Sequence, residues 1–266
     1  MKRHLPIVLA LISSAGCSAS GSKPPSEPAA ETEGPSAQPA TSGTSAAADV
    51  LPCIDDDEAG CTAKCDSGDL ESCVRLARIY SFGNANVRTN LPKARALADR
   101  ACTGGLGKGC YSLATAYELG SGVSKDPQKA QQLTTKAIPL LIAACEGADA
   151  ESCSILADMH LSGQGMLKDS AKEADLRRRA TDLYGRSCEA GDASACFMFG
   201  GDMLTAKKFE LAARVLEKGC NLGDAGSCSL LGGCYDEGVG VKADPAKAKA
   251  LWAKACKGGN VASCSR

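Results

Sequence analysis

Cysteine pairs recur along this chain at one spacing, with seven residues between the two members of each pair. Seven pairs have this spacing: Cys53 with Cys61, Cys65 with Cys73, Cys102 with Cys110, Cys145 with Cys153, Cys188 with Cys196, Cys220 with Cys228 and Cys256 with Cys264. From Cys65 onward, the first cysteines of successive pairs lie 32 to 43 residues apart. A period in this range is typical of a repeat built from two helices. The pattern predicts an all-α fold, a right-handed α-solenoid of helix-turn-helix repeats.

The residues after each second cysteine follow helical spacing. The third position is large and apolar in every unit: Leu76, Leu113, Leu156, Phe199 and Leu231. A small residue follows, and the seventh position is again large. Offsets of 0, 3, 4 and 7 share one face of an α-helix, so each second cysteine should begin the buried face of a first helix. A Gly-rich turn and an Asp or Asn before Pro or Ser then predict a second helix.

The spacing also predicts how the cysteines pair. A second helix ends at the first cysteine of a pair, and the next first helix carries the second cysteine, so the two sulfurs lie within disulfide reach. We expect seven such disulfides, each stabilising by about 2–3 kcal/mol. Cys61 and Cys65 are one helical turn apart and could compete for either partner. Cys234 has no partner and is predicted to be a free thiol. Zinc sites need close pairs converging in fours, so we expect no metal or cofactor.

The N-terminal residues resemble a bacterial export signal. Residues 1–16 combine a basic start with an apolar stretch at 5–12 that is too short to span a bilayer. The run from Ser14 to Cys17 resembles a lipobox, although Ser14 stands where that motif usually has an aliphatic residue. We expect lipidation of Cys17; the alternative is a cleaved, soluble periplasmic protein. Ser18 follows Cys17, at the position where an Asp often retains lipoproteins at the inner membrane. By that resemblance the outer membrane is the favoured location.

The rest of the chain divides into three parts. Residues 17–50 are rich in Ser, Pro and Ala and are predicted to be a lipidated, disordered tether, since they carry too little apolar surface to offset the entropy of ordering. Residues 51–64 are expected to form an N-terminal cap. Residues 65–266 are expected to form the solenoid, with about five helix pairs and a truncated end.

The unit from Cys220 to Cys256 resembles the Sel-one-like repeat family, especially its exported, cysteine-rich bacterial branch. Its motif here is A-C-x-x-G-D-x-x-x-C-x-x-L-x-x-x-Y-x-x-G-x-G-V-x-K-D-x-x-K-A, and the fourth unit departs from it by lacking the Gly-x-Gly turn. The resemblance implies disulfide-stapled helix pairs and a protein-interaction scaffold. Some members of this branch are described as penicillin-binding or β-lactamase proteins. The alternative function is therefore binding or hydrolysis of β-lactams or peptidoglycan fragments.

Residues suited to catalysis are scarce. The two histidines are His4, in the export signal, and His160, at a position that is Tyr in other repeats. The one Ser-x-x-Lys run, Ser20 to Lys23, falls in the predicted tether. We therefore name no catalytic residue, and an enzyme is less expected than a binding protein. A net charge of −1 gives no reason to expect a nucleic-acid partner.

The function expected from these features is a lipid-anchored scaffold of the bacterial cell envelope, facing the periplasm or the cell surface. Its partner would be a protein or peptide bound on the concave face, which the first helices form. The facing positions are two and five residues after each second cysteine, where side-chain chemistry changes between units while the core pattern does not. These candidates are Arg75, Arg78, Ser112, Thr115, Ile155, Asp158, Met198 and Leu230.

Overall fold

A computed structural model describes residues 53, 58–84 and 87–266. The predicted signal, the lipidation site at Cys17 and the tether lie outside the described residues, as does part of the predicted cap. All described helices belong to one compact unit, Asp49–Arg266.

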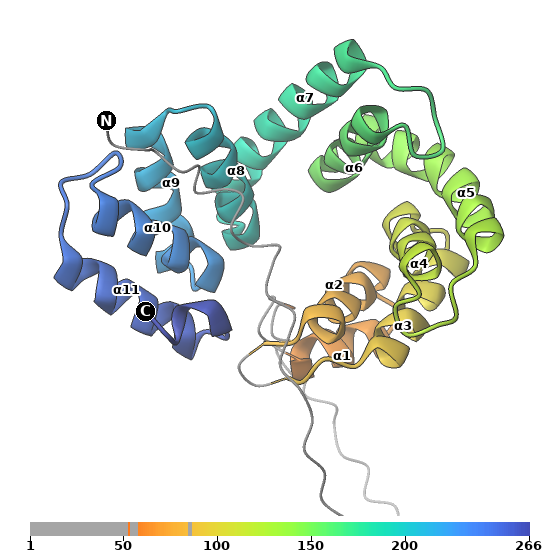
Figure 1. Ribbon diagram of the computed structural model, residues 1–266, viewed down its shortest axis with the longest axis horizontal. Coiled ribbons are helices and arrows are strands. Elements are labelled where there is room, and N and C mark those ends of the chain that lie inside the picture. Colours follow the sequence, from red (N-terminus) through yellow and green to blue (C-terminus); the bar gives the residue numbers. More distant parts are fainter. Residues whose placement is uncertain (1–52, 54–57, 85–86) are drawn as a thin grey trace, which may run out of the picture. The chain divides into compact units, whose positions relative to one another are not determined.

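The described residues form α-helices in pairs, followed by one short 3-10 helix, and no strand (Figure 1). The helix that begins each pair is α2 (Leu70–Phe82), α4 (Gly107–Leu119), α6 (Ala150–Ser162), α8 (Ala193–Thr205) or α10 (Ala225–Glu237). The second helix is α3 (Leu91–Thr103), α5 (Pro127–Glu146), α7 (Ser170–Glu189), α9 (Phe209–Asn221) or α11 (Pro245–Lys257). Helix α1 (Glu58–Asp66) precedes the pairs, and the 3-10 helix Val261–Ser263 follows them. Each helix packs on its neighbours in the chain, which confirms the predicted α-solenoid.

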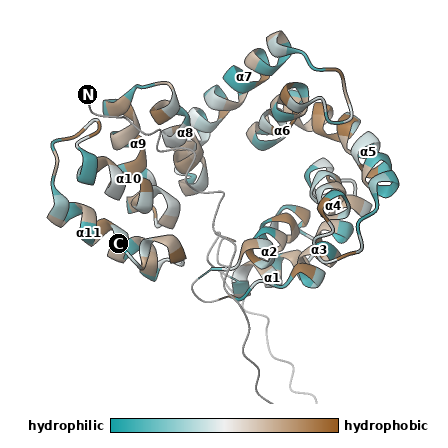
Figure 2. Cartoon of the chain, in the orientation of Figure 1, coloured by the Kyte–Doolittle hydropathy of each residue, from teal (hydrophilic) through white to brown (hydrophobic). Residues whose placement is uncertain are grey.

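The core follows the predicted positions. The leucines three residues after the second cysteine, such as Leu76 and Leu231, are buried. The next residue is small because the second helix approaches closely there. At Gly232, for example, an added Cβ would lie 2.5 Å from Nε1 of Trp252 in α11. In Figure 2, α7 is largely hydrophilic, in keeping with its few buried residues, Ala180, Tyr184 and Cys188.

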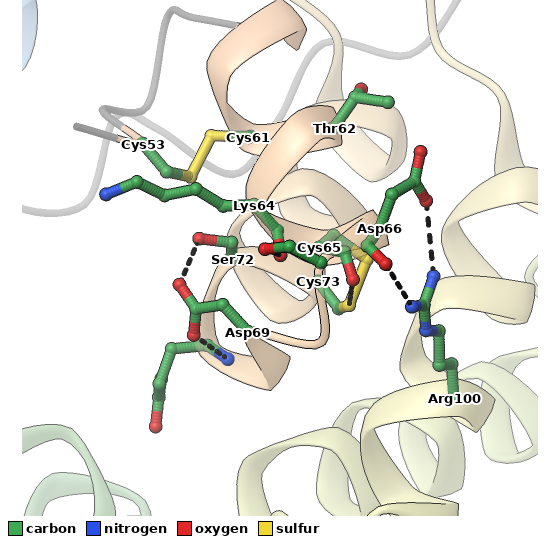
Figure 3. Close-up of a disulfide and its surroundings, with 12 residues drawn as sticks. Cys53, Cys61, Thr62, Lys64, Cys65, Asp66, Asp69, Ser72, Cys73 and Arg100 are labelled. Carbon is green, nitrogen blue, oxygen red and sulfur yellow. Dashed lines mark hydrogen bonds and ion pairs between the residues drawn. A yellow bond between two sulfur atoms is a disulfide. The ribbon is translucent and has the colours of Figure 1, made fainter. Parts of the chain in front are cut away.

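Disulfides join the cysteines in seven local pairs, with Cα atoms 4.3 to 4.8 Å apart. The bonds join Cys53 to Cys61, Cys65 to Cys73, Cys102 to Cys110, Cys145 to Cys153, Cys188 to Cys196, Cys220 to Cys228 and Cys256 to Cys264. Each cysteine is thus bonded to the partner eight residues away that the sequence predicts. Cys61 and Cys65, which could have competed, take different partners although they belong to the same helix (Figure 3).

The three central disulfides lie in the largest apolar cluster of the array. Their second cysteines, Cys110, Cys153 and Cys196, have no exposed surface, and all three belong to the largest apolar cluster. Cys264 in the last disulfide is exposed instead. Between two units, each bond joins the end of one second helix to the start of the next first helix. The central staples therefore contribute to the apolar core as well as to the covalent frame.

A basic side chain strengthens every junction. The tenth residue of each second helix donates a hydrogen bond to a carbonyl at the end of the preceding second helix or of α1. The bonds are Arg100 to Asp66 O, Lys136 to Cys102 O, Arg179 to Glu146 O, Lys218 to Glu189 O and Lys254 to Cys220 O, at 2.8 to 3.4 Å. The last carbonyls of a helix have no partner within it and carry partial negative charge, so a cation is favourable there.

The second helices have two lengths. Helices α3, α9 and α11 have 13 residues, while α5 and α7 have 20. Seven extra residues add about two full turns, so the buried face and the disulfide stay in register. Helix α5 also continues through Pro139. First helices α8 and α10, on either side of the short α9, pack directly on each other, and among the described helices no comparable contact joins α6 to α8 across the long α7.

Cys234 is the free thiol of the described residues, and it is buried in the cluster formed by α9, α10 and α11. Burial, with Glu237 nearby, raises the pKa of this thiol to about 11. The reactive thiolate is therefore scarce at neutral pH, and access to it is blocked.

We expect Cys234 to resist alkylation by iodoacetamide in the native protein and to react once the protein is denatured without reduction. Peptide mass spectrometry would locate the label. Substantial labelling of Cys234 under native conditions would contradict this placement.

Ala148 is the exception among the junction turns. The third residue after the first cysteine is Gly at the other junctions and takes a left-handed conformation, and Ala148 takes it too, at φ 71°. A Cβ at the equivalent Gly191 would meet nothing within 4 Å. A side chain at this position therefore meets no steric clash. The free-energy cost of Ala148 comes from its left-handed backbone conformation.

We expect Ala148→Gly to stabilise the protein by about 0.5–1 kcal/mol, because relief of the left-handed strain exceeds the added entropy of the unfolded chain. The reciprocal change Gly191→Ala should destabilise by about 1 kcal/mol. Thermal or urea unfolding with disulfides intact would measure both. Shifts of the same sign in the two variants would refute the explanation.

Candidate partner-binding groove

A groove of about 740 Å³ runs along the first helices of the array. Helices α2, α4, α6 and α8 supply most of its lining, and α3 and α7 contribute from behind. The short α3 and the long α5 and α7 lie on the same part of the array as the groove. Around the short α9, where α8 and α10 pack together, the groove ends.

The groove contains most of the side chains predicted to face a partner. Seven of them line it: Arg75, Arg78, Ser112, Thr115, Ile155, Asp158 and Met198. Leu230 does not, because it is half-buried against the apolar cluster of α9 to α11. The prediction assumed that all five units present the same face to one groove. The closer packing around α9 removes α10 from it.

Three groove residues that were not predicted bring a charge or an aromatic ring from other positions. Lys108 lies in the first turn of α4, Arg95 comes from the second helix α3, and Tyr184 lies on the long α7. One signal in the sequence could have identified Lys108. It stands two residues before a second cysteine, where the adjacent units have Glu71 and Glu151. Tyr184 stands four residues before Cys188, at a position that is buried in every second helix, and this pattern predicts a core residue and not a groove residue.

Lys108 joins three carboxylates at the floor of the groove. Its Nζ lies 2.7 Å from Oε2 of Glu71, 3.2 Å from Oε2 of Glu151 and 3.3 Å from Oδ1 of Asp149. Its side chain is only 5% exposed, whereas the carboxylates are a third to a half exposed. A cation is unfavourable at a helix N-terminus, so these carboxylates are needed to stabilise the charge of Lys108 in the first turn of α4. The cluster, here called the Lys108 ladder, connects α2, α4 and α6.

The ladder sets the electrostatics of the groove floor. Burial alone would lower the pKa of Lys108, but Glu151, Glu71 and Asp149 outweigh it and raise the pKa above the ordinary value. Burial also raises the pKa of Tyr184, with Glu151, Asp149 and Asp202 acting in the same direction and Arg78 opposing them.

Other features that could carry chemistry lie elsewhere. His160 is at the end of α6, where Nδ1 contacts the carbonyl of Leu167 at 3.2 Å, and it does not line the groove. Among residues 53, 58–84 and 87–266, no three His, Cys, Asp or Glu side chains are arranged to hold a metal ion. Within the same residues, every helix is too short or too polar to cross a membrane.

We expect Lys108→Met to destabilise the protein by about 2 kcal/mol, since it leaves three carboxylates facing one another at the floor of the groove. Because the folded-state pKa of Lys108 is raised, the charge contributes fully below the unfolded value of about 10.4 and is lost as pH rises through the folded value. The difference from wild type should thus be constant near neutral pH and shrink in strong alkali.

Urea unfolding at several pH values would measure this, with Lys249→Met as the control at an exposed lysine of α11. Adding Glu151→Gln to Lys108→Met should recover part of the loss, because it removes one of the facing charges. Equal effects of Lys108→Met and Lys249→Met would show that the ladder does not stabilise the array.

Solved structures to which this chain is similar include a Sel1 repeat protein from Oxalobacter formigenes, with 23% identity, a TM-score of 0.41 and coverage of 78% of this chain and 57% of that one. Another is the immunity protein Pa5087 from Pseudomonas aeruginosa, with 21% identity, a TM-score of 0.43 and coverage of 74% and 68%.

Curated relatives match a shorter stretch. Cytochrome c oxidase assembly factor 7 from Xenopus tropicalis is 34% identical over 73 residues, which is 27% of this chain and 32% of the relative. Cytochrome c oxidase assembly factor 7A from Xenopus laevis is 33% identical over 73 residues, again 27% of this chain and 32% of the relative. The matched stretch thus spans about a third of the length of these relatives.

The model of the Sel1 repeat matches residues 70–106, 107–138, 150–192 and 225–260, together more than half of the chain. The longer of the two gaps between these matches, residues 193–224, holds α8 and α9, the pair without the Gly-x-Gly turn. This chain belongs to the Sel1 repeat family.

Proposed function

We propose that this protein is a lipid-anchored scaffold of the bacterial cell envelope that binds a protein or peptide partner in its groove. Sel1 repeats generally mediate protein–protein interaction, and the curated relatives are named as assembly factors. The envelope location and the anchor are inferred from the N-terminal sequence and from disulfides, which persist in oxidising compartments.

The observation that carries the proposal is the contrast between the frame and the groove lining. The buried positions repeat from unit to unit, as leucines, small residues and cysteines. The groove positions two and five residues after each second cysteine are instead Arg and Arg in α2, Ser and Thr in α4, and Ile and Asp in α6. Packing does not require this variation, so it is what a site built on a repeated frame would show.

The site is rigid as well as varied. Disulfides hold the junctions between units, and the Lys108 ladder ties α2, α4 and α6 together at the groove floor. A rigid surface loses little conformational entropy on binding, which favours affinity for a partner.

We expect a photo-crosslinking residue at Ser112, exposed in the middle of the groove, to give one dominant crosslinked partner in cells that produce the full chain. The same residue at Lys249, exposed on α11 and outside the groove, is the matched control. Adding Ser112→Trp to a chain with the crosslinker at Thr115 should prevent the crosslink by filling the groove. Equal crosslinking from Ser112 and Lys249 would oppose a partner site in the groove.

The anchor has its own test. Cys17→Ser should prevent labelling by a radioactive or clickable fatty acid and move the protein from the membrane fraction to the soluble fraction. Retention of both label and membrane association in Cys17→Ser would exclude Cys17 as the lipidation site.

A further inference from the structure

Exposed apolar side chains gather at one end of the first helices. Among the described residues, the four large apolar side chains with the highest exposed fractions, 59% to 88%, lie in the last turn of α2, α4 or α6 or in the loop after α6. These four, here called the apolar rim, are Phe82, Leu119, Leu161 and Leu167. In α10 the positions equivalent to Leu119 and Leu161 hold Glu237 and Asp236, so the repeat frame does not require apolar residues there. An exposed apolar patch of this kind marks a surface that meets a partner or a membrane.

The rim is continuous along three units. Nε2 of Gln164, in the loop after α6, donates a hydrogen bond to Oε2 of Glu118 at the end of α4, at 2.8 Å. The loop after α4 lies against the start of α3, where a Cβ on Gly122 would come within 2.5 Å of the Leu91 backbone. Leu91 and Phe82 in turn line the same groove. Each of these two loops therefore contacts the unit before it, and the rim forms one edge of the array.

A cationic pocket of about 760 Å³ opens beside the rim, at the loop after α4. Arg95 of α3, Lys125 of the loop and Lys129 of α5 line it, together with one carboxylate, Asp126. The ammonium group of Lys129 lies over the ring of Tyr117, 4.4 Å from its centre. Within the described part of the chain, Arg95 and Lys125 form no ion pair, so their charges are available to an anion. A guanidinium and an ammonium group at one pocket suit a phosphate group.

Each loop of the rim carries an exposed cation. Arg88 follows α2, Lys125 follows α4 and Lys168 follows α6. The carboxylates of these loops, Asp126 and Asp169, accept hydrogen bonds from backbone amides in the first turns of α5 and α7. Cations beside protruding apolar side chains are the combination that binds the interface of an anionic bilayer.

The chain that leads to the proposed anchor enters the array at this edge. Cys53, the first described residue, packs in one cluster with Ile79 in the last turn of α2 and Val87 in the loop that follows. A flexible tether over residues 18–50 would reach roughly 30 Å, so an anchor at Cys17 would keep the rim close to the bilayer. At the high effective concentration that such a tether gives, weak contacts are enough to hold the rim on the membrane.

We infer that the apolar rim docks on the bilayer that holds the anchor. Phe82, Leu119 and Leu167 enter the interfacial region, and a lipid phosphate group binds between Arg95 and Lys125. The inference rests on the proposed lipid anchor and adds the face that the array presents to the membrane. Separate protruding side chains favour a lipid surface over a protein, because lipids rearrange around them whereas a protein must supply a complementary surface. Phe82 also lines the groove, so docking holds one end of the groove beside the bilayer.

Tryptophans placed in the rim test this in the lipidated full chain, reconstituted with its disulfides intact into vesicles of phosphatidylethanolamine and phosphatidylglycerol. Lipids brominated in the acyl chain should quench Leu119→Trp and Leu167→Trp about twofold, after subtraction of the signal of Trp252, the one tryptophan of the wild type. Leu222→Trp is the matched control and should not be quenched, because Leu222 is an exposed leucine at a junction turn, at the other end of the helices.

The cationic pocket is tested in the full chain with Cys17→Ser and Leu119→Trp, which meets the vesicles without an acyl chain. Half-maximal quenching should need at least about fivefold more lipid when phosphatidylcholine replaces phosphatidylglycerol, or when Arg95→Glu and Lys125→Glu are added. Arg214→Glu with Lys249→Glu, exposed on α9 and α11, is the matched charge reversal and should change the lipid requirement less than about twofold. Circular dichroism melting would verify that each variant is folded.

Quenching at Leu119→Trp and Leu167→Trp no greater than at Leu222→Trp would overturn the inference and leave the anchored scaffold standing. Calorimetric binding of inorganic phosphate without quenching at the rim would overturn it in favour of a soluble anion. A photo-crosslinker at Leu119 that captures one protein and no lipid would overturn it in favour of a protein partner. Failure of the anchor is distinguishable: Cys17 would carry no fatty-acid label, while quenching in the Cys17→Ser chain would still support docking of the rim.

Discussion

The disulfide between successive units is the interaction on which the rest of this structure depends. A helical repeat contacts only its neighbours, so the array is no stronger than its junctions. Here each junction combines three local elements: a covalent bond between the end of one helix and the start of the next, a turn in the left-handed conformation, and a cation on the last carbonyls of the preceding helix. The cores are small and contain many alanines, so they bury little apolar area, and the disulfides supply stability that such cores lack.

Secure junctions allow the length of the second helix to vary. Two added turns in α5 and α7 keep the tenth-residue cation and the buried cysteine on the same face, because seven residues are close to a whole number of turns. On the side of the first helices, α8 and α10 pack together across the short α9, whereas the first helices that flank the short α3 and the long α5 and α7 line the groove.

The Lys108 ladder shows how an unfavourable residue serves such a site. A lysine in the first turn of α4 opposes the helix dipole and is almost fully buried, yet equivalent positions in the two adjacent units supply glutamates.

The sequence by itself determined the helices, their order and the core positions, because these depend on local spacing: cysteines eight apart, leucine three later and glycine at the turns. For the same reason it predicted the disulfide partners, such as Cys110 for Cys102, and seven of the eight groove positions, since residues at equal offsets share one helix face. Only the tertiary structure decided that Leu230 is outside the groove, and that Lys108, Arg95 and Tyr184 are inside it. Those outcomes depend on how far apart neighbouring first helices stand and on contacts between residues of different units, such as Lys108 with Asp149, and no local spacing encodes such distances.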